Sequence, residues 1–254
     1  MGTIITIAIQ KGGSAKTSTA VNLASALACK GNKVLLIDTD SQGNAGQALG
    51  VVDDDKNIAA VLGGQCQLSE AIRQVGNLDL LPSASILSTY ENALTAQANV
   101  FAIKQYITDA IKSQYDYVII DTPPSDGVIV RNALVASDYA LIPCQAQTFA
   151  LKGLQRAIKL IETVRQHYNP SLQLIGILPT MLQLNTNMGT LVIKQLQQDY
   201  GKLVTPFAVP LTVKVTESQL IGMPLIEYEA NNPASRVYNQ LANMIDSKVR
   251  EAQK

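Results

Sequence analysis

The sequence has one histidine, three cysteines and no long hydrophobic run. Cys29, Cys66 and Cys144 are widely separated and lack metal-ligand spacing, so we expect free thiols in a reducing cytosol. His167 lies near the end of a predicted helix, where a surface or capping role is expected. Histidine-based catalytic triads and zinc sites are therefore excluded.

The sequence also has no excess charge of either sign, with 20 Lys and Arg against 20 Asp and Glu. Any nucleic-acid binding must therefore come from a local patch and not from bulk basicity. No apolar stretch approaches the ~20 residues that span a bilayer. The first residues enter a predicted strand with no charged and then apolar leader, so we expect a cytoplasmic protein without a stable membrane anchor.

Short apolar runs alternate with helix-length segments along all 254 residues. This alternation predicts one α/β domain, residues 1–254, with a doubly wound, mostly parallel sheet flanked by helices. The predicted strands are Ile4–Ile9, Val34–Ile37, Leu78–Leu81, Tyr117–Ile120, Tyr139–Ile142, Leu174–Leu178 and Val204–Val209. The predicted helices are Thr17–Lys30, Asn99–Ser113, Leu151–Tyr168, Thr186–Tyr200 and Pro233–Glu251. Ligands are expected at the carboxyl ends of the strands.

The first candidate site is the stretch Ile4–Thr19, in which an apolar strand leads through a glycine turn to a helix. Backbone N–H groups of such a turn and the start of the helix attract phosphates, and Lys16 adds a mobile charge. The Thr17 hydroxyl is a candidate ligand for the magnesium ion that accompanies a triphosphate. The candidate nucleotide-binding residues of this turn are Lys11, Gly12, Gly13, Ser14, Ala15, Lys16, Thr17 and Ser18. The usual pattern G-x-x-x-x-G-K-[ST] has glycine where this chain has Gln10 and Ala15, so a simple turn between strand and helix stays an alternative.

Two later strands also end in acids. Asp38 and Asp40 follow an apolar run and are expected on one side of the sheet beside the phosphate loop. Asp121 ends another apolar run and is followed by two prolines. A carboxylate at this position of a phosphate-binding protein reaches magnesium through water, so Asp38 and Asp121 are candidate metal residues. The alternative for the acids at both strand ends is a structural role in a turn that follows a core strand.

Together these segments resemble the ParA/MinD family of P-loop ATPases, whose deviant Walker A signature is KGGxGKT. The resemblance implies that Lys11 reaches the phosphates of a partner subunit, that Lys16 binds phosphate and that Thr17 binds magnesium. The family sequence D-x-D-P-Q-G-N corresponds to Asp38–Asn44 and implies that Asp40 positions or deprotonates the attacking water. Ala15 departs from the family glycine, a change that costs least if its φ angle is negative.

The resemblance extends through the second half of the chain. The segment Ala140–Gln155 resembles IPVQPEYLALEGL, and Lys152 stands where acidic residues are frequent. It is either a cation that shares the role of Lys11 at the subunit interface or a solvated lysine at a helix start. Thr180, Met181 and Pro210 correspond to residues around the adenine in relatives. Lys214 matches a basic residue that relatives use against DNA, and Arg236, Lys248 and Arg250 are candidates for the same patch, although a solvated helix explains the C-terminus equally well.

The function implied by the resemblance is a magnesium-dependent ATPase switch with slow turnover. It would form an ATP-bound homodimer, bind DNA without sequence preference on the nucleoid, and release it when a ParB-like or other adaptor protein stimulates hydrolysis. The cargo would be a plasmid, a chromosome or a protein body such as a carboxysome. Three alternatives stay open: a MinD-like membrane-associated ATPase, a metabolic P-loop ligase, and a regulator that binds nucleotide without hydrolysis.

Overall fold

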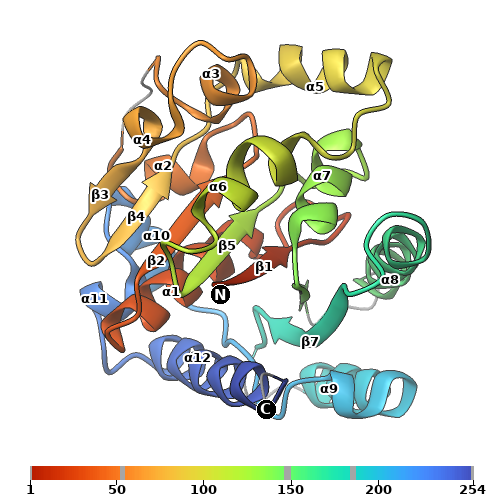
Figure 1. The fold of residues 1–254 in the computed structure, drawn as a ribbon. Helices are drawn as coiled ribbons and strands as arrows, with labels where there is room; N and C mark the ends of the chain where they lie inside the picture. Colours follow the sequence, from red (N-terminus) through yellow and green to blue (C-terminus); the bar gives the residue numbers. More distant parts are fainter. Residues whose placement is uncertain (1, 52–54, 146–149, 184–186, 253–254) are drawn as a thin grey trace.

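A computed structural model of the chain describes residues 2–51, 55–145, 150–183 and 187–252. Seven strands form one sheet in the order β3-β4-β2-β5-β1-β6-β7 (Figure 1). The strands are β1 (Thr3–Ile7), β2 (Val34–Asp38), β3 (Arg73–Val75), β4 (Leu78–Leu81), β5 (Tyr117–Asp121), β6 (Tyr139–Gln145) and β7 (Gln173–Thr180). Neighbouring strands are parallel except β3, which pairs antiparallel with β4 at one edge. The predicted fold class is confirmed.

Helices cover both faces of the sheet, which explains why the central strands are apolar on both sides. Strand alternation divides the buried side chains into two cores: Ile4, Leu35 and Ile120 belong to one, and Ile5, Leu36 and Ile119 to the other. The face with Ile5 is covered by α1 (Lys16–Cys29), α2 (Asn44–Ala48), α11 (Leu225–Tyr228) and α12 (Pro233–Ala252), with α10 (Lys214–Leu220) beside them. The face with Ile4 is covered by α3 (Ile58–Leu62), α4 (Leu68–Ala71), α5 (Leu87–Ala96), the π-helical turn η1 (Lys104–Thr108), α6 (Asp109–Ile111), α7 (Val128–Ala136), α8 (Ala150–His167) and α9 (Asn187–Tyr200).

Six of the seven predicted strands are present within a few residues of their expected bounds. The prediction of a strand at Val204–Val209 is wrong. This segment follows the 3₁₀ turn η2 (Gly201–Leu203), and it forms an isolated bridge from Val204 to Ile177 and a few backbone hydrogen bonds at its two ends, but no continuous ladder. The helix expected at Asn99–Ser113 is shorter, since Asn99 Oδ1 accepts the Phe101 N–H and holds that stretch outside the helix. The predicted helix start at Thr186 lies outside the described residues.

The carboxyl ends of β1, β2 and β5 meet at one edge of the sheet. Residues Asp38 and Asp121 are direct register partners at the ends of β2 and β5, and Ile7 of β1 pairs with Asp121 on its other side. The chain leaves β1 through the glycine turn and enters α1 directly above this edge. Within the described residues, no helix combines the length and the apolar character needed to cross a bilayer.

Candidate functional site

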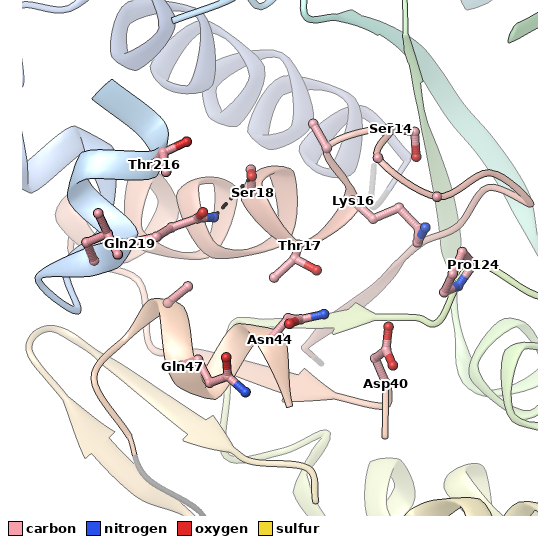
Figure 2. A pocket seen from close by; sticks show the side chains of 15 residues that line it. Ser14, Lys16, Thr17, Ser18, Asp40, Asn44, Gln47, Pro124, Thr216 and Gln219 are labelled. Carbon is pink, nitrogen blue, oxygen red and sulfur yellow. Dashed lines mark hydrogen bonds between the residues drawn. The ribbon is translucent and has the colours of Figure 1, made fainter. Parts of the chain in front are cut away.

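A pocket of about 440 Å³ opens at this edge, over the first turn of α1 (Figure 2). Residues 12–18 form one wall, and Ala15 stands at the N-cap without any side-chain hydrogen bond to the helix. No acidic side chain occupies the first turn of α1. The N–H groups at the start of α1 therefore have no capping side chain, and together with the helix dipole they form an anion-binding end.

In the part of the chain that the structure describes, Lys16 supplies the only ammonium group in the lining of this pocket. Its side chain is buried, and Nζ donates a hydrogen bond to the Lys11 carbonyl at 3.2 Å. Burial lowers the pKa of Lys16, and the nearby carboxylates of Asp121 and Asp40 oppose that shift. A phosphate would supply the negative charge that a buried ammonium requires.

Asp121 is fully buried, and neither of its carboxylate oxygens has a hydrogen-bond partner among the described residues. Burial raises the pKa of Asp121, and the charge of Asp38 raises it further. The nearby Thr17 hydroxyl lowers this pKa, although it lies outside hydrogen-bonding geometry. An unpartnered carboxylate beside a hydroxyl fits a hard divalent cation such as magnesium, which is held by few protein ligands together with phosphate and water oxygens. Consistent with so sparse a ligand set, the described residues contain no cluster of three His, Cys, Asp or Glu.

Asp38 has different contacts, although it was also expected beside the metal. Its Oδ1 accepts the Asp40 N–H at 3.0 Å, and its Oδ2 accepts the Ala45 N–H at 2.9 Å. Burial raises the pKa of Asp38, and the backbone hydrogen bonds counteract part of that effect. Both oxygens hold backbone groups, so Asp38 anchors the loop from Asp40 to α2. Its role beside the metal stays a prediction.

Asp40 lies in the pocket wall opposite the phosphate loop, and Figure 2 shows its carboxylate at the same end of the pocket as Lys16 and Pro124. One of its oxygens accepts the Gln42 N–H at 3.0 Å, which fixes the carboxylate against its own turn. A carboxylate held in this way, next to a phosphate site, can orient a water molecule or accept its proton.

The opposite end of the pocket is formed by two short helices that the sequence analysis did not identify. Asn44, Gln47 and Ala48 come from α2, and Thr216, Gln219 and Leu220 come from α10. Gln219 Nε2 donates to the Ser18 hydroxyl at 3.2 Å and so joins α10 to the start of α1. Asn44 belongs to the matched segment Asp38–Asn44. Lys214, the first residue of α10, was a DNA-binding candidate, but no residue of α10 was predicted to line the nucleotide pocket.

The two candidate lysines at the subunit interface lie close together but outside the pocket lining. Lys11 Nζ donates to Gln145 Oε1 at 2.9 Å. Lys152 is exposed near the start of α8, and the adjacent Gly153 packs against Lys11, whose Cβ would lie 3.5 Å from a Cβ at Gly153. Residues 146–149 of the segment that precedes α8 lie outside the described residues.

The three candidate adenine residues lie behind the phosphate loop and do not line the pocket. The Thr180 hydroxyl donates to the Ser14 carbonyl at 3.2 Å and so supports the loop. Met181 has a φ angle of 53°, and the next residue, Leu182, accepts the Leu211 N–H. This pairing ties Pro210 to the end of β7.

The four candidate DNA-binding cations are dispersed. Lys214 pairs with Glu217 at 2.7 Å, and Lys248 Nζ donates to the Ile175 carbonyl at 2.7 Å. Arg236 and Arg250 are exposed, but their spacing of 14 residues places them about 21 Å apart along α12. The structure does not bring the four into one patch.

Comparisons with known proteins identify relatives of this chain. The AAA domain family matches residues 2–174. The sporulation initiation inhibitor protein Soj of Bacillus subtilis is 36% identical over 249 residues, covering 96% of this chain and 98% of Soj. The chromosome partitioning protein ParA of Caulobacter vibrioides is 35% identical over 256 residues, covering 98% of this chain and 96% of ParA.

A solved structure gives the same fold with a ligand. Cobyrinic acid a,c-diamide synthase from Mycobacterium smegmatis, with bound ADP and magnesium, superposes with a TM-score of 0.85 at 30% identity, covering all of this chain and 96% of that one. Three findings agree with one another: the family match over residues 2–174, the match to Soj and ParA over nearly the full length, and the strand order of the sheet. The chain therefore belongs to the ParA/MinD-type P-loop ATPases.

Proposed function

We propose that this protein is a magnesium-dependent ATPase of the ParA type that acts as a nucleotide-gated switch. The observation that carries the proposal is the convergence of three groups in one pocket: the uncapped start of α1, the buried ammonium of Lys16 and the unpartnered carboxylate of Asp121. These groups are complementary to a triphosphate with its metal ion. The bound magnesium of the 30% identical solved structure supports the same assignment.

The residues of this chain divide the chemistry between them. The N–H groups of the glycine turn and Lys16 hold the phosphates and stabilise the charge that develops as the terminal phosphoryl group leaves. Thr17 and Asp121 would hold the magnesium ion, which neutralises the phosphate charge. Asp40 orients the attacking water and accepts its proton. Asp38 keeps the Asp40 loop in place through its two backbone hydrogen bonds.

The switch acts through a second copy of the chain. Two protomers clamp two ATP molecules face to face, and Lys11, or Lys152 beside it, crosses to the phosphates of the partner. ATP favours this closed dimer because it contacts the dimer better than the open monomer. The dimer binds nucleoid DNA without sequence preference, a cytoplasmic adaptor stimulates hydrolysis, and a cargo moves on the resulting gradient. The name of the Caulobacter vibrioides relative, chromosome partitioning protein ParA, supports this reading.

A second candidate function is a metabolic ligation that uses ATP. It is favoured by one observation, the name of the 30% identical structure, a synthase that forms diamides. A ligase needs a substrate pocket beyond the nucleotide and has no need of DNA-dependent dimerisation.

The test is ATP turnover together with the oligomeric state of the purified chain. We expect slow magnesium-dependent hydrolysis that Asp40→Ala abolishes, while that variant with ATP and magnesium sediments as a dimer and retains DNA fragments. Turnover that is unchanged in Asp40→Ala, or an ATP-bound monomer, contradicts the proposal. Hydrolysis that appears only with an added acid and amine donor supports the ligase instead.

A further inference from the structure

A second cavity, of about 310 Å³, lies between α7 and α8 and shares no lining residue with the nucleotide pocket. Figure 1 shows these two helices side by side on the same face of the sheet. Arg131 of α7 and Arg156 and Lys159 of α8 line this cavity, together with Leu160, which is buried in the core and 7% exposed. We call it the α7–α8 cavity.

The α7–α8 cavity carries an excess of positive charge. Its three cations face a single lining carboxylate, that of Asp126. Among the described residues none of the three forms an ion pair with a carboxylate. Arg131 Nε donates instead to the Asp126 carbonyl at 3.3 Å, which anchors the guanidinium and leaves its terminal N–H groups for another partner.

The cations of α8 are arranged for a common ligand. Arg156, Lys159 and Thr163 lie at spacings of three and four residues, which places them on one face of the helix. Like charges at this spacing repel one another, so an anion between them and Arg131 removes an unfavourable interaction. Two arginines from different helices also match the planar, two-oxygen geometry of a carboxylate.

We propose that the α7–α8 cavity binds an acidic segment of a partner protein, through carboxylates on Arg131, Arg156 and Lys159. The lining favours this occupant over nucleic acid, because its three cations gather in one cavity and not along a stripe that could follow successive phosphates. The segment would also touch both edges of the nucleotide site. Gln10 in the lining directly precedes Lys11, and Asp126 follows Pro124 by two residues, while Pro124 lines the nucleotide pocket.

The identification of this partner with the adaptor that stimulates hydrolysis rests on the proposed function, but binding itself does not. The probe is a fluorescent peptide, Glu-Glu-Leu-Glu-Glu-Leu, compared by anisotropy with the same peptide carrying glutamine for glutamate. The full chain is titrated with ATP and magnesium and again without nucleotide. We expect the acidic peptide to bind about tenfold more tightly than its neutral counterpart.

Matched variants separate the cavity from general charge. Arg131→Gln/Arg156→Gln should lose about tenfold in affinity for the acidic peptide, as expected for the loss of charge-assisted hydrogen bonds. Arg165→Gln/Lys194→Gln removes the same charge from exposed positions outside the cavity and should change affinity by less than about twofold. Equal losses in both variants, or no preference for the acidic peptide, overturn the proposal.

A duplex of about 20 base pairs forms the second arm. If the cavity variant loses affinity for the duplex while the acidic peptide does not bind the wild type, the surface binds nucleic acid and the proposal is wrong. Failure of the proposed function looks different: the wild type then shows no ATP hydrolysis although the peptide result stands. Hydrolysis without peptide discrimination removes only the α7–α8 cavity proposal.

Discussion

Ala15 is the residue at which the phosphate loop carries backbone strain. Its φ angle is 65°, in the left-handed region, where a Cβ costs about 1 kcal/mol or more relative to glycine. We expect Ala15→Gly to raise the free energy of unfolding by up to about 1 kcal/mol, since the gain in the folded state is partly offset by the greater freedom of glycine in the unfolded chain. Urea unfolding of the ligand-free protein measures the change.

A matched control for this substitution lies in the helix that follows. Ala20 is fully buried in the interior of α1, so Ala20→Gly should lower the free energy of unfolding by about 1 kcal/mol. Opposite signs for the two substitutions are the expected result. A loss of stability in Ala15→Gly as large as that in Ala20→Gly contradicts the assignment of strain.

Asp121 is a residue whose contribution to stability should reverse when ligand binds. Its two buried oxygens have no hydrogen-bond partner among the described residues, and Asp38 lies directly across the strand register. At a pH above the raised pKa of this carboxyl, Asp121→Asn should therefore stabilise the ligand-free protein by about 1–3 kcal/mol, because it removes an unpaired buried charge. The same substitution should abolish the rise in melting temperature that magnesium and ADP cause in the wild type.

Thermal unfolding with and without ligand measures both effects on one sample. Thr122, the next residue, has a hydroxyl that donates to the Ile7 carbonyl, and it offers a control that disturbs the same strand end without touching the carboxylate. Thr122→Val should lower stability and keep the ligand-induced rise. Retention of the full rise in Asp121→Asn is incompatible with a metal-holding role.

At the scale of the residue, the roles of individual side chains were predictable because each residue type can take only a few roles. Lys16, Thr17, Asp40 and Asp121 all came from short motifs, and the structure brings them to one sheet edge. The φ angle of Ala15 was not predictable, since it is set by the path of the whole loop. The hydrogen bond of Lys11 to Gln145 depends on two segments 134 residues apart, which the sequence does not align.

Short elements around the pocket were the hardest to predict. The helices α2 and α10 have only five and seven residues, so neither shows a sustained apolar period. Val213 and Leu220 are apolar but 71% and 82% exposed, so the apolar residues around α10 do not mark a buried helix face. The helix α7, expected after the Asp126-Gly127 loop, had no predicted bounds for the opposite reason: it is buried on nearly every side and lacks the polar face of an amphipathic helix.

The contact between α2 and α10 depends on two glycines, Gly50 just after α2 and Gly222 just after α10. A Cβ at Gly222 would lie 2.7 Å from the Gly50 Cα and 2.9 Å from the Gly50 nitrogen, and Gly222 has a φ angle of +70°. Gly222→Ala should therefore cost about 2 kcal/mol or more, from the left-handed backbone and from overpacking against rigid main chain. It should also weaken nucleotide binding, because α10 forms one end of the pocket.

Gly64→Ala separates the two contributions to this cost. Gly64 has nearly the same φ angle, +68°, but nothing lies within 4 Å of a Cβ at that position. We expect this control to cost only the backbone term of about 1 kcal/mol and to leave nucleotide affinity unchanged. Chemical denaturation and a titration with fluorescent ADP give the two readouts. Equal effects of both substitutions would mean that the close approach of Gly50 and Gly222 carries no energy.

At the scale of the whole molecule, the class of fold followed from the alternation of strands and helices, but the order of the strands did not. The strand β5 lies between β1 and β2 although it follows β2 by almost 80 residues, and each pairs with it in register, as Ile5 and Leu36 both do with Ile119. Periodicity reports which faces of a strand are buried and not which neighbour buries them. The edge strand β3, with three residues, gave no signal at all.

Asp246 joins three elements at the end of the sheet remote from the nucleotide pocket. It extends from α12, pairs with Lys30 at the end of α1, and accepts the Tyr117 hydroxyl of β5 at 2.5 Å. Burial acts to raise the pKa of Asp246, but the hydrogen bonds from Lys30 and Tyr117 outweigh it and hold the pKa below its usual range. The helix α12 is therefore held against the core by a charge as well as by its apolar face.

This charge gives a stability contribution that depends on pH. A carboxyl whose pKa is depressed by folding stabilises the protein above the pKa of the unfolded chain, about 4, and loses that contribution as the pH falls through the folded pKa. Asp246→Asn should accordingly cost about 1.5 kcal/mol near pH 7, and the difference from the wild type should shrink steadily below pH ~4. Asp109→Asn, an exposed control with no recorded side-chain partner among the described residues, should stay within about 0.5 kcal/mol throughout. Urea unfolding at a series of pH values tests this expectation, and a difference for Asp246→Asn that does not change between pH 7 and acid would show that packing, and not the charge, holds α12 in place.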